Sequence, residues 1–216
     1  MTPFAYDAWY DRPQGRWIGD TEYRLMLREL GLPAAGRMLD VGCGTGWFTR
    51  RLAQLPGLEV TGLDISGEAL EFARSRDARS FYVQADAQAL PFADGSFDYC
   101  FSVAALCFAT DWKKAVAECV RVTRKRFAIG LLNRHSLHWL DKGRHGGSGA
   151  YSGALWLSPG EFRNGLQGLA VTGVRLHSAI FVPSGSGWAR MAERLLPARL
   201  PLGALMVISG QPCSGS

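Results

Sequence analysis

Hydrophobic positions recur at two different spacings along the first 132 residues. Apolar residues three and four positions apart predict amphipathic helices, at 21–30, 45–55, 67–75 and 111–122. Short apolar runs predict strands between them, at 37–41, 58–63, 80–84, 97–102 and 127–132. The last three helices have polar residues suited to capping their N-termini, namely Thr45, Ser66 and Asp111. Strands alternating with helices indicate a parallel sheet covered on both faces, with ligands bound beyond the carboxyl ends of the strands.

After residue 132 the pattern changes. Residues 133–153 are rich in glycine and hold three of the four histidines, which predicts an irregular lid over the carboxyl edge of the sheet. Ser158 and Glu161 form a capping box that opens a helix to about residue 166. Two further strands, at 171–182 and 205–209, predict an antiparallel hairpin at the end of the sheet.

The predicted fold is therefore α/β. It is a doubly wound, mostly parallel sheet of seven strands with an antiparallel last strand and helices on both faces. One domain is expected over residues 1–216. Within it we expect an N-terminal helical flap at 1–35, a ligand-binding core at 36–132, and a lid and substrate-side part at 133–216.

Composition and charge narrow the class of protein only slightly. The net charge of +5 is spread along the chain, and the densest basic run, at 124–126, is short, so nucleic acid is not an expected partner. Five cysteines without a Cys-x-x-Cys pair predict a reduced, cytoplasmic protein. The aromatic, acidic N-terminus is unlike a signal peptide, and no run approaches the ~18 apolar residues of a membrane span.

The most informative stretch is MLDVGCGTGWFTR at 38–50, where glycines occupy positions 42, 44 and 46 between a predicted strand and a helix. Glycines let a ligand lie against the backbone, and the helix N-terminus offers free N–H groups. A dinucleotide loop needs a third glycine where this chain has Trp47, which argues against NAD or FAD. The lysine of a phosphate-binding P-loop is also absent.

Carboxylates follow this loop at the ends of two predicted strands. Asp64 at the second strand can accept hydrogen bonds from both hydroxyls of a ribose, and Asp86 at the third from an adenine amino group. Asp40 precedes the loop, where it suits a ligand with a positive ammonium group. A lone Asp at such a position more often caps a helix or a turn, but the joint placement favours a nucleoside ligand.

Together, MLDVGCGTGWFTR, VTGLDIS and QADAQALPFADGSFDYCFS resemble the class I S-adenosylmethionine-dependent methyltransferases, and within them the small-molecule group called methyltransferase type 11. The resemblance implies a Rossmann-like fold, S-adenosyl-L-methionine as cofactor and S-adenosyl-L-homocysteine as product. It implies that the glycine loop lies against the methionine part and that Ile65 and Ala87 lie against the adenine. The residues that it assigns to cofactor binding are Asp40, Gly42, Cys43, Gly44, Gly46, Asp64, Ile65, Asp86, Ala87 and Ser102.

The acceptor pocket is expected between the N-terminal segment, the loop after the fourth strand and the lid. Apolar residues in that loop, Leu106 and Phe108 among them, favour an apolar acceptor. The aromatic residues of FAYDAWYDR either dock a helix on the core or close a flap over the cofactor. His135 and His138 are the first catalytic candidates as general bases, against the alternative of exposed loop histidines, and no metal is expected.

The leading hypothesis is a methyltransferase that moves a methyl group to a small-molecule acceptor by in-line displacement. RNA methylation is an alternative, although the place after the fourth strand reads Ser-Val-Ala-Ala and lacks the Asn/Asp-Pro-Pro-aromatic pattern of base-amino methylation. A non-catalytic cofactor-binding or scaffold protein of the same fold is another. The sequence leaves open the acceptor atom and the oligomeric state.

Overall fold

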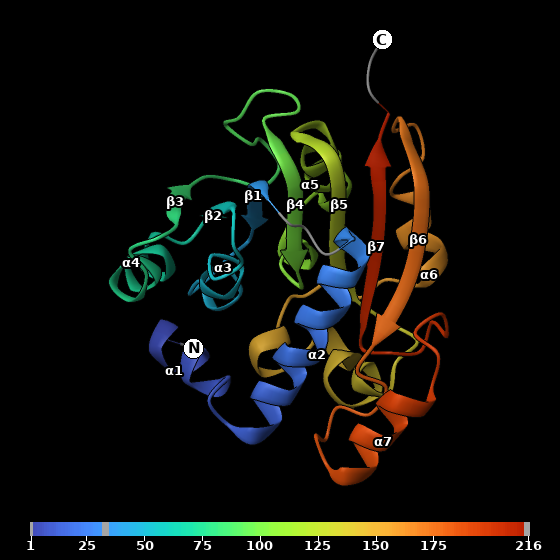
Figure 1. The fold of residues 1–216 in the computed structure, drawn as a ribbon. Helices are drawn as coiled ribbons and strands as arrows, with labels where there is room; N and C mark the ends of the chain where they lie inside the picture. Colours follow the sequence, from blue (N-terminus) through green and yellow to red (C-terminus); the bar gives the residue numbers. More distant parts are fainter. Residues whose placement is uncertain (1, 32–34, 214–216) are drawn as a thin grey trace.

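A computed structural model describes residues 2–31 and 35–213 of the chain. Its described strands form one seven-stranded sheet in the order β3-β2-β1-β4-β5-β7-β6 (Figure 1). The first five strands run parallel, whereas β7 pairs antiparallel with both β5 and β6. The predicted sheet, with its antiparallel end, is confirmed. The strands are β1 (Gly36–Val41), β2 (Leu58–Asp64), β3 (Phe81–Gln84), β4 (Phe97–Val103), β5 (Thr123–Leu132), β6 (Val171–Ala179) and β7 (Leu205–Pro212).

Helices cover both faces of the sheet because successive strand residues point to opposite sides. Met38 belongs to a buried core that includes residues of α2 and α3, whereas Leu39 belongs to a second core with α5. Among the described residues, no helix combines the length and apolarity needed to cross a membrane. The α-helices are α1 (Pro3–Trp9), α2 (Pro13–Leu30), α3 (Trp47–Leu52), α4 (Gly67–Arg76), α5 (Trp112–Arg121), α6 (Pro159–Asn164) and α7 (Gly187–Leu195).

Several predicted helix starts are confirmed by their caps. The side chains of Ser66 and Asp111 accept hydrogen bonds from the first turns of α4 and α5, and Ser158 forms the expected capping box with Glu161. The prediction for Thr45 was wrong, since α3 begins after Gly46, whose left-handed φ of 77° reverses the chain. The Thr45 hydroxyl donates to Asp7 of α1 at 2.9 Å instead.

Other boundaries also differ from the prediction. Helix α2 begins at Pro13, well before the predicted start at residue 21, and α7 was not predicted. Strand β6 ends at Ala179, short of the predicted 182, because Ile180 adopts a positive φ of 65° that breaks the strand. The left-handed Gly31 ends α2 as expected, while Pro33, the other predicted stop signal, lies outside the described residues.

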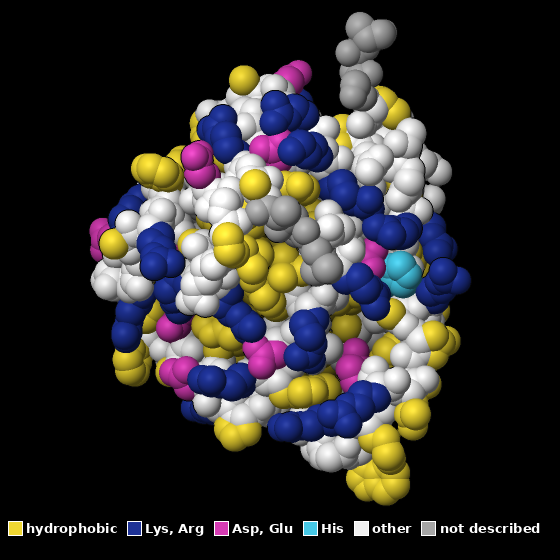
Figure 2. Space-filling view, in the orientation of Figure 1, with side chains coloured by type: hydrophobic (Ala, Val, Ile, Leu, Met, Phe, Trp, Pro, Cys, Tyr) yellow, Lys and Arg dark blue, Asp and Glu magenta, His cyan; other side chains and the backbone are white. Residues whose placement is uncertain are grey.

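The fold places the N-terminal helix α1 beside the carboxyl edge of the sheet. The carboxyl ends of the parallel strands face the same way, and α1 lies beside that edge next to α4 (Figure 1). Figure 2 shows the face covered by α2, where Lys and Arg side chains are spread out with acidic groups between them. On this face, the excess positive charge does not form a single basic patch.

Candidate functional site

A cavity of about 400 Å³ opens at the carboxyl ends of β1, β2, β3 and β4. This volume lies within the roughly 300–1,000 Å³ of ordinary ligand sites. Every residue that lines it belongs to the first 110 residues, so the segment after β5, predicted as a lid, contributes none of the described lining. The walls come from α1 and the residue that caps it (Tyr6, Tyr10), the glycine loop (42–45), the start of α3 (Trp47, Phe48), the end of β2 (63–65), the segment after β3 (85–88), and residues 103–106 and 108–110.

The glycines of the loop serve different purposes. Gly42 has a φ of 74°, and a Cβ on it would collide with the Cβ of Ala105, so this glycine lets the loop pack under the chain that leaves β4. Gly44 has a φ of 53°, and a Cβ there would meet no protein atom within 4 Å. That side of Gly44 therefore faces open space in the cavity wall, where a ligand can lie against the backbone.

Asp64 anchors the loop and faces the cavity. One carboxylate oxygen accepts the N–H of Gly44 at 2.7 Å and the other accepts the N–H of Ser66 at 2.9 Å. The remaining lone pairs leave the carboxylate able to accept two vicinal hydroxyls. The next residue, Ile65, has 68% of its surface exposed although it lines the cavity, so it offers an apolar surface to a planar ring.

Asp86 lies farther along the same wall with Ala87 and Gln88. The backbone N–H of Gln88 donates to Asp86 at 2.8 Å, and this bond together with the Gln88 side chain lowers the pKa of the Asp86 carboxyl. The Gln88 side chain also accepts the N–H of Asp111 at 2.8 Å. Sequence reasoning missed Gln88, since no motif marks a glutamine that joins a binding loop to a helix start.

Three predicted cofactor residues, Asp40, Gly46 and Ser102, do not line the cavity. Asp40 is 2% exposed and accepts the hydroxyl of Thr49 at 2.6 Å, and burial raises the pKa of its carboxyl to about 7. Ser102 was predicted at the very end of the fourth strand but lies inside β4, which continues to Val103, and it is fully buried with its hydroxyl donating to the Val41 carbonyl at 2.8 Å. The wall at this point consists of Val103 and Ala104.

Cys43 and Gly46 have structural roles within the glycine loop. Cys43 lines the cavity but is only 8% exposed, and burial raises the pKa of its thiol far above neutral, so it is an unreactive spacer. A Cβ on Gly46 would press on the side chains of Tyr82 and Ala73, so this glycine lets the loop pack close to α4 and β3.

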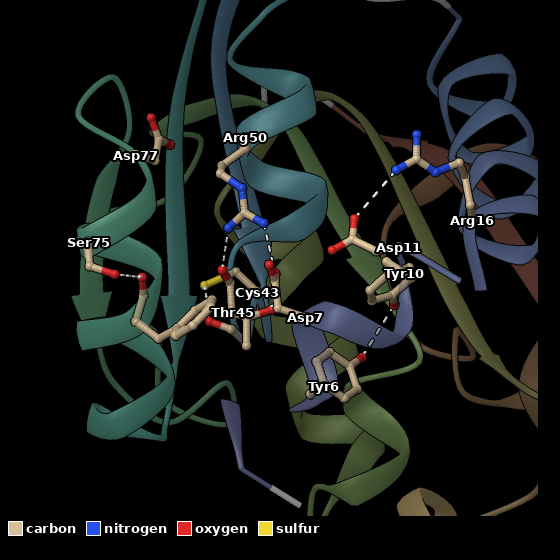
Figure 3. A network of polar contacts seen from close by, with 12 residues as sticks. Tyr6, Asp7, Tyr10, Asp11, Arg16, Cys43, Thr45, Arg50, Ser75 and Asp77 are labelled. Carbon is tan, nitrogen blue, oxygen red and sulfur yellow. Dashed lines mark hydrogen bonds and ion pairs between the residues drawn. The ribbon is translucent and has the colours of Figure 1, made fainter. Parts of the chain in front are cut away.

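Helix α1 is fastened onto the glycine loop by polar contacts (Figure 3). One oxygen of Asp7 accepts from Arg50 at 2.8 Å and from the Thr45 hydroxyl at 2.9 Å. Tyr6 and Tyr10 line the cavity beside this contact. The helix therefore both docks on the core and closes one side of the cavity, which combines the two roles considered for it.

The two candidate histidines lie away from the cavity lining. His135 is exposed. His138 is half-buried against Tyr151, with ring centroids 4.8 Å apart, and burial lowers the pKa of its imidazole. Its Nδ1 is buried without a hydrogen-bond partner in the described structure. Within residues 2–31 and 35–213, no three His, Cys, Asp or Glu side chains cluster as metal ligands would.

Part of the chain is similar to known proteins. Residues 39–127 match the family described as "Methyltransferase domain". The malonyl-[acyl-carrier protein] O-methyltransferase of Erwinia pyrifoliae is 40% identical over 115 residues, which cover 50% of this chain and 44% of that protein. The O-methyltransferase cnsE of Penicillium expansum is 39% identical over 131 residues, which cover 56% and 48%. The chain thus spans less than half the length of these two relatives.

Solved structures share the whole fold. An S-adenosylmethionine-dependent methyltransferase of Thermotoga maritima, described as a possible histamine N-methyltransferase, has a TM-score of 0.72 at 22% identity, with 97% of this chain and 95% of that chain covered. An S-adenosylmethionine-dependent methyltransferase of Mesorhizobium loti has a TM-score of 0.60 at 23% identity, with 85% and 94% covered. At these identities the likeness shows the fold and carries no information about the acceptor.

Proposed function

We propose that the chain transfers the methyl group of S-adenosylmethionine to a small-molecule acceptor, a proposal that the match of residues 39–127 to the family described as "Methyltransferase domain" supports. The observation that carries the proposal is the cavity wall. Gly44 leaves open space against the backbone, and Asp64, Ile65 and Asp86 follow in line along the same wall. Two carboxylates and an exposed apolar side chain suit the ribose and adenine of a nucleoside.

The residues present fit this cofactor part by part. Asp64 would accept the ribose hydroxyls, and Ile65 would pack on the adenine, while Asp86 would accept the adenine amino group. The glycine loop, with Cys43 as spacer, would hold the methionine end. Asp40 lies behind the loop, so we propose that it acts there indirectly, through Thr49 and the loop backbone. Ser102 would likewise act by fixing the chain that leads to Val103 and Ala104.

The chemistry asks little more of the protein than positioning. When bound, the cofactor supplies a methyl group on a positive sulfonium, which is already activated for displacement. The chain has to hold an acceptor in line with that methyl group and exclude water, and such positioning is worth about 7 kcal/mol or more. Helix α1 performs part of this task, since Tyr6 and Tyr10 cover one side of the cavity. Burial lowers the pKa of the His138 imidazole and so favours its neutral form. By packing on Tyr151, it would hold the phenol of that residue in place.

The acceptor is proposed to be small and partly apolar. Leu106 and Phe108 line the cavity, and Phe108 keeps 50% of its surface exposed there. The relatives named above methylate oxygen, in one case on a malonyl group linked to acyl carrier protein, but they match less than two thirds of their own length. We also propose a cytoplasmic location, with which the five free cysteines agree.

Turnover tests the proposal. Purified protein is incubated with methyl-labelled S-adenosylmethionine and, in parallel, with a pool of metabolites below 1 kDa, with total RNA, or with buffer alone. The proposal predicts labelled product and S-adenosylhomocysteine only with the metabolite pool. Label on RNA would favour the RNA alternative, and cofactor binding without turnover on any pool would favour a non-catalytic protein of the same fold.

A further inference from the structure

Helix α7 carries an apolar stripe on its outer face. Trp188, Met191 and Leu195 are three and four residues apart, so they share one side of the helix. They are 77%, 43% and 74% exposed, and Trp188 and Leu195 are the most exposed large hydrophobic residues in the described structure. The helix rests on the protein by another side, where Ala189 is fully buried. The stripe therefore has no partner within residues 2–31 and 35–213.

The one acidic residue of this region points away from the stripe. Glu193 is the only Asp or Glu in residues 181–213. Its carboxylate accepts the backbone N–H of Ile180 at 3.0 Å and that of Phe181 at 3.1 Å, which follow β6. Glu193 comes five residues after Trp188, which places the two on roughly opposite sides of a helix with about 3.6 residues per turn. Its negative charge is thus directed at the protein and does not offset charges on the outer surface.

Arginines flank the stripe without acidic partners. Arg190 and Arg194 are four residues apart on a neighbouring side of α7, and Arg199 follows the helix. All three are exposed. In the part of the chain that the structure describes, none of them forms an ion pair, and Arg190 donates to the Gly185 carbonyl at 3.2 Å. The local charge is therefore positive, and these guanidinium groups are free to pair with anions.

The stripe lies at the same edge of the sheet as the cavity. Ala179, the last residue of β6, pairs with Leu205 of β7, and Leu205 pairs with Leu132 at the carboxyl end of β5. Helix α7 follows β6, so it lies beyond the carboxyl edge (Figure 1). Figure 2 shows hydrophobic side chains that project from this end of the molecule, with Lys and Arg side chains beside them. The surface here projects outwards and does not form a groove.

We propose that α7 binds the surface of a membrane that contains anionic lipids. A short helix with Trp and Leu on one side and Arg beside them is typical of helices that lie in the plane of a membrane interface. The indole of Trp188 suits the level of the headgroups, and the side chains of Met191 and Leu195 suit the acyl boundary below it. The arginine guanidinium groups pair well with lipid phosphates.

The charge of this surface disfavours a second copy of the chain as the occupant. In an isologous dimer the same patch lies on both sides of the interface. The arginines beside one stripe would then lie close to those beside the other, and the only acidic residue of the region, Glu193, is bound to the protein's own backbone. An anionic lipid surface meets the same arginines with opposite charge.

The binding should need both the apolar and the charged groups. Three apolar side chains on a helix of nine residues bury little area in a bilayer, so electrostatic attraction has to supply the rest. That attraction acts over about one Debye length, so it weakens as salt is added. The inference goes beyond the proposed function, since binding to lipid requires neither cofactor nor acceptor.

The test is sedimentation of the full chain with vesicles, made either of phosphatidylcholine alone or of equal parts of phosphatidylcholine and phosphatidylglycerol. We expect wild type to bind the anionic vesicles at least about tenfold more strongly than the neutral ones, and to lose most of this binding at high salt. The double substitution Trp188→Ser with Leu195→Ser removes the stripe, and Arg190→Gln with Arg194→Gln removes the neighbouring charge. Each pair should weaken binding to the anionic vesicles at least about tenfold.

Matched changes elsewhere on the surface are the controls. Phe81→Ser replaces a residue that is 71% exposed on β3, at the opposite end of the sheet from β6. Arg76→Gln with Arg79→Gln removes two exposed charges at and after the end of α4. Both controls should bind vesicles like wild type, and circular dichroism checks that every variant is folded. If the change at Trp188 and Leu195 prevents folding, the arginine variant and the preference of wild type between the two kinds of vesicle still decide.

Equal binding of wild type to both kinds of vesicle, or binding to neither, overturns the proposal. So does binding that survives the loss of Trp188 and Leu195, or that falls as much in Phe81→Ser. Sedimentation velocity without lipid tests the other occupant. A dimer of wild type that the change at Trp188 and Leu195 abolishes, together with no binding to vesicles, would assign the stripe to a contact between two copies and overturn the lipid proposal.

Discussion

The ring of Tyr10 stacks on the indole of Trp47, with the centroids 4.2 Å apart and the planes at 16°. Tyr10 follows α1 and Trp47 is the first residue of α3, so this pair joins the N-terminal helix to the helix behind the glycine loop. Trp47 stands where a dinucleotide loop has its third glycine. The bulky residue that argues against NAD thus supports the aromatic wall that closes the cavity.

Tyr10→Ala should therefore weaken both the fold and cofactor binding. Tyr10 is 5% exposed, and removing a buried aromatic ring costs about 3 kcal/mol of unfolding free energy. We expect the affinity for S-adenosylhomocysteine to fall with it, because α1 loses its hold beside the loop. Urea unfolding and calorimetry measure the two effects. Tyr10→Phe keeps the ring and should retain both properties, and a similar loss in Phe and Ala variants would contradict the stacking argument.

Substitutions at two glycines of the loop should separate an effect on folding from an effect on ligand binding. Gly42→Ala should destabilise the protein strongly, because its Cβ would collide with Ala105. Gly44→Ala meets no protein atom and should cost only the roughly 1–2 kcal/mol of a left-handed alanine. Its Cβ would nevertheless occupy the ligand's space, so the affinity for S-adenosylhomocysteine should fall at least about tenfold. Thermal unfolding and calorimetry on both variants check this, and unchanged affinity in Gly44→Ala would show that the ligand lies elsewhere.

Asp64→Ala should reduce cofactor affinity by a large factor while the sheet stays folded. Hydrogen bonds to a charged group contribute about 1.5–3 kcal/mol, or roughly ten- to a hundredfold in affinity. Some of the loss will come from the Gly44 N–H, which would lose its acceptor. Glu71→Ala, an exposed change on α4, is the control and should bind normally. If Asp64→Ala binds S-adenosylmethionine as tightly as wild type, the ribose assignment is wrong.

A prediction about pH concerns the other end of the sheet. Burial alone would raise the pKa of Asp98, but hydrogen bonds from Arg124, the Arg37 N–H and Lys125 hold it at about 2, below its ordinary 3.8. A carboxyl with a lowered pKa in the folded state adds stability above pH 3.8 that is lost as the pH falls towards 2. Its size is roughly 1–2 kcal/mol, since Arg124 and Lys125 are more than half exposed and solvent screens them.

Asp98→Asn isolates this contribution. The difference in unfolding free energy between wild type and the variant should be constant from pH 7 to pH 4 and should shrink between pH 4 and pH 2. Urea unfolding at several pH values measures it. A difference that stays constant down to pH 2 would mean that the ordinary pKa of Asp98 is unchanged in the folded protein.

The sequence predicted the parts of the molecule that depend on local chemistry. Strand and helix periodicity predicted the alternation of strands and helices along the chain, and side chains with a free oxygen, such as Ser66 and Asp111, marked true helix starts. The start of α2 could not be predicted in this way, because Gly15 and Gly19 have poor helix propensity. Tertiary packing explains why glycine occurs at these two positions. Aromatic rings or backbone atoms of neighbouring segments occupy the space that a Cβ would need.

The sequence predicted well the site residues that follow the end of a strand. It predicted less well those residues whose side chains can point either into the cavity or into the protein. Asp64 and Asp86 line the cavity as expected, whereas Asp40 and Ser102 turn into the protein. For Ser102 the reason is that β4 ends at Val103, one residue later than predicted, and sequence patterns do not fix strand ends that closely.

The central claim is that the cavity binds S-adenosylmethionine, and calorimetric titration with S-adenosylmethionine, S-adenosylhomocysteine and NAD in parallel tests it most directly. The account predicts binding of the first two at one site per chain and no binding of NAD. Binding of NAD alone would contradict the interpretation of the glycine loop, and so would an absence of binding by both S-adenosyl compounds.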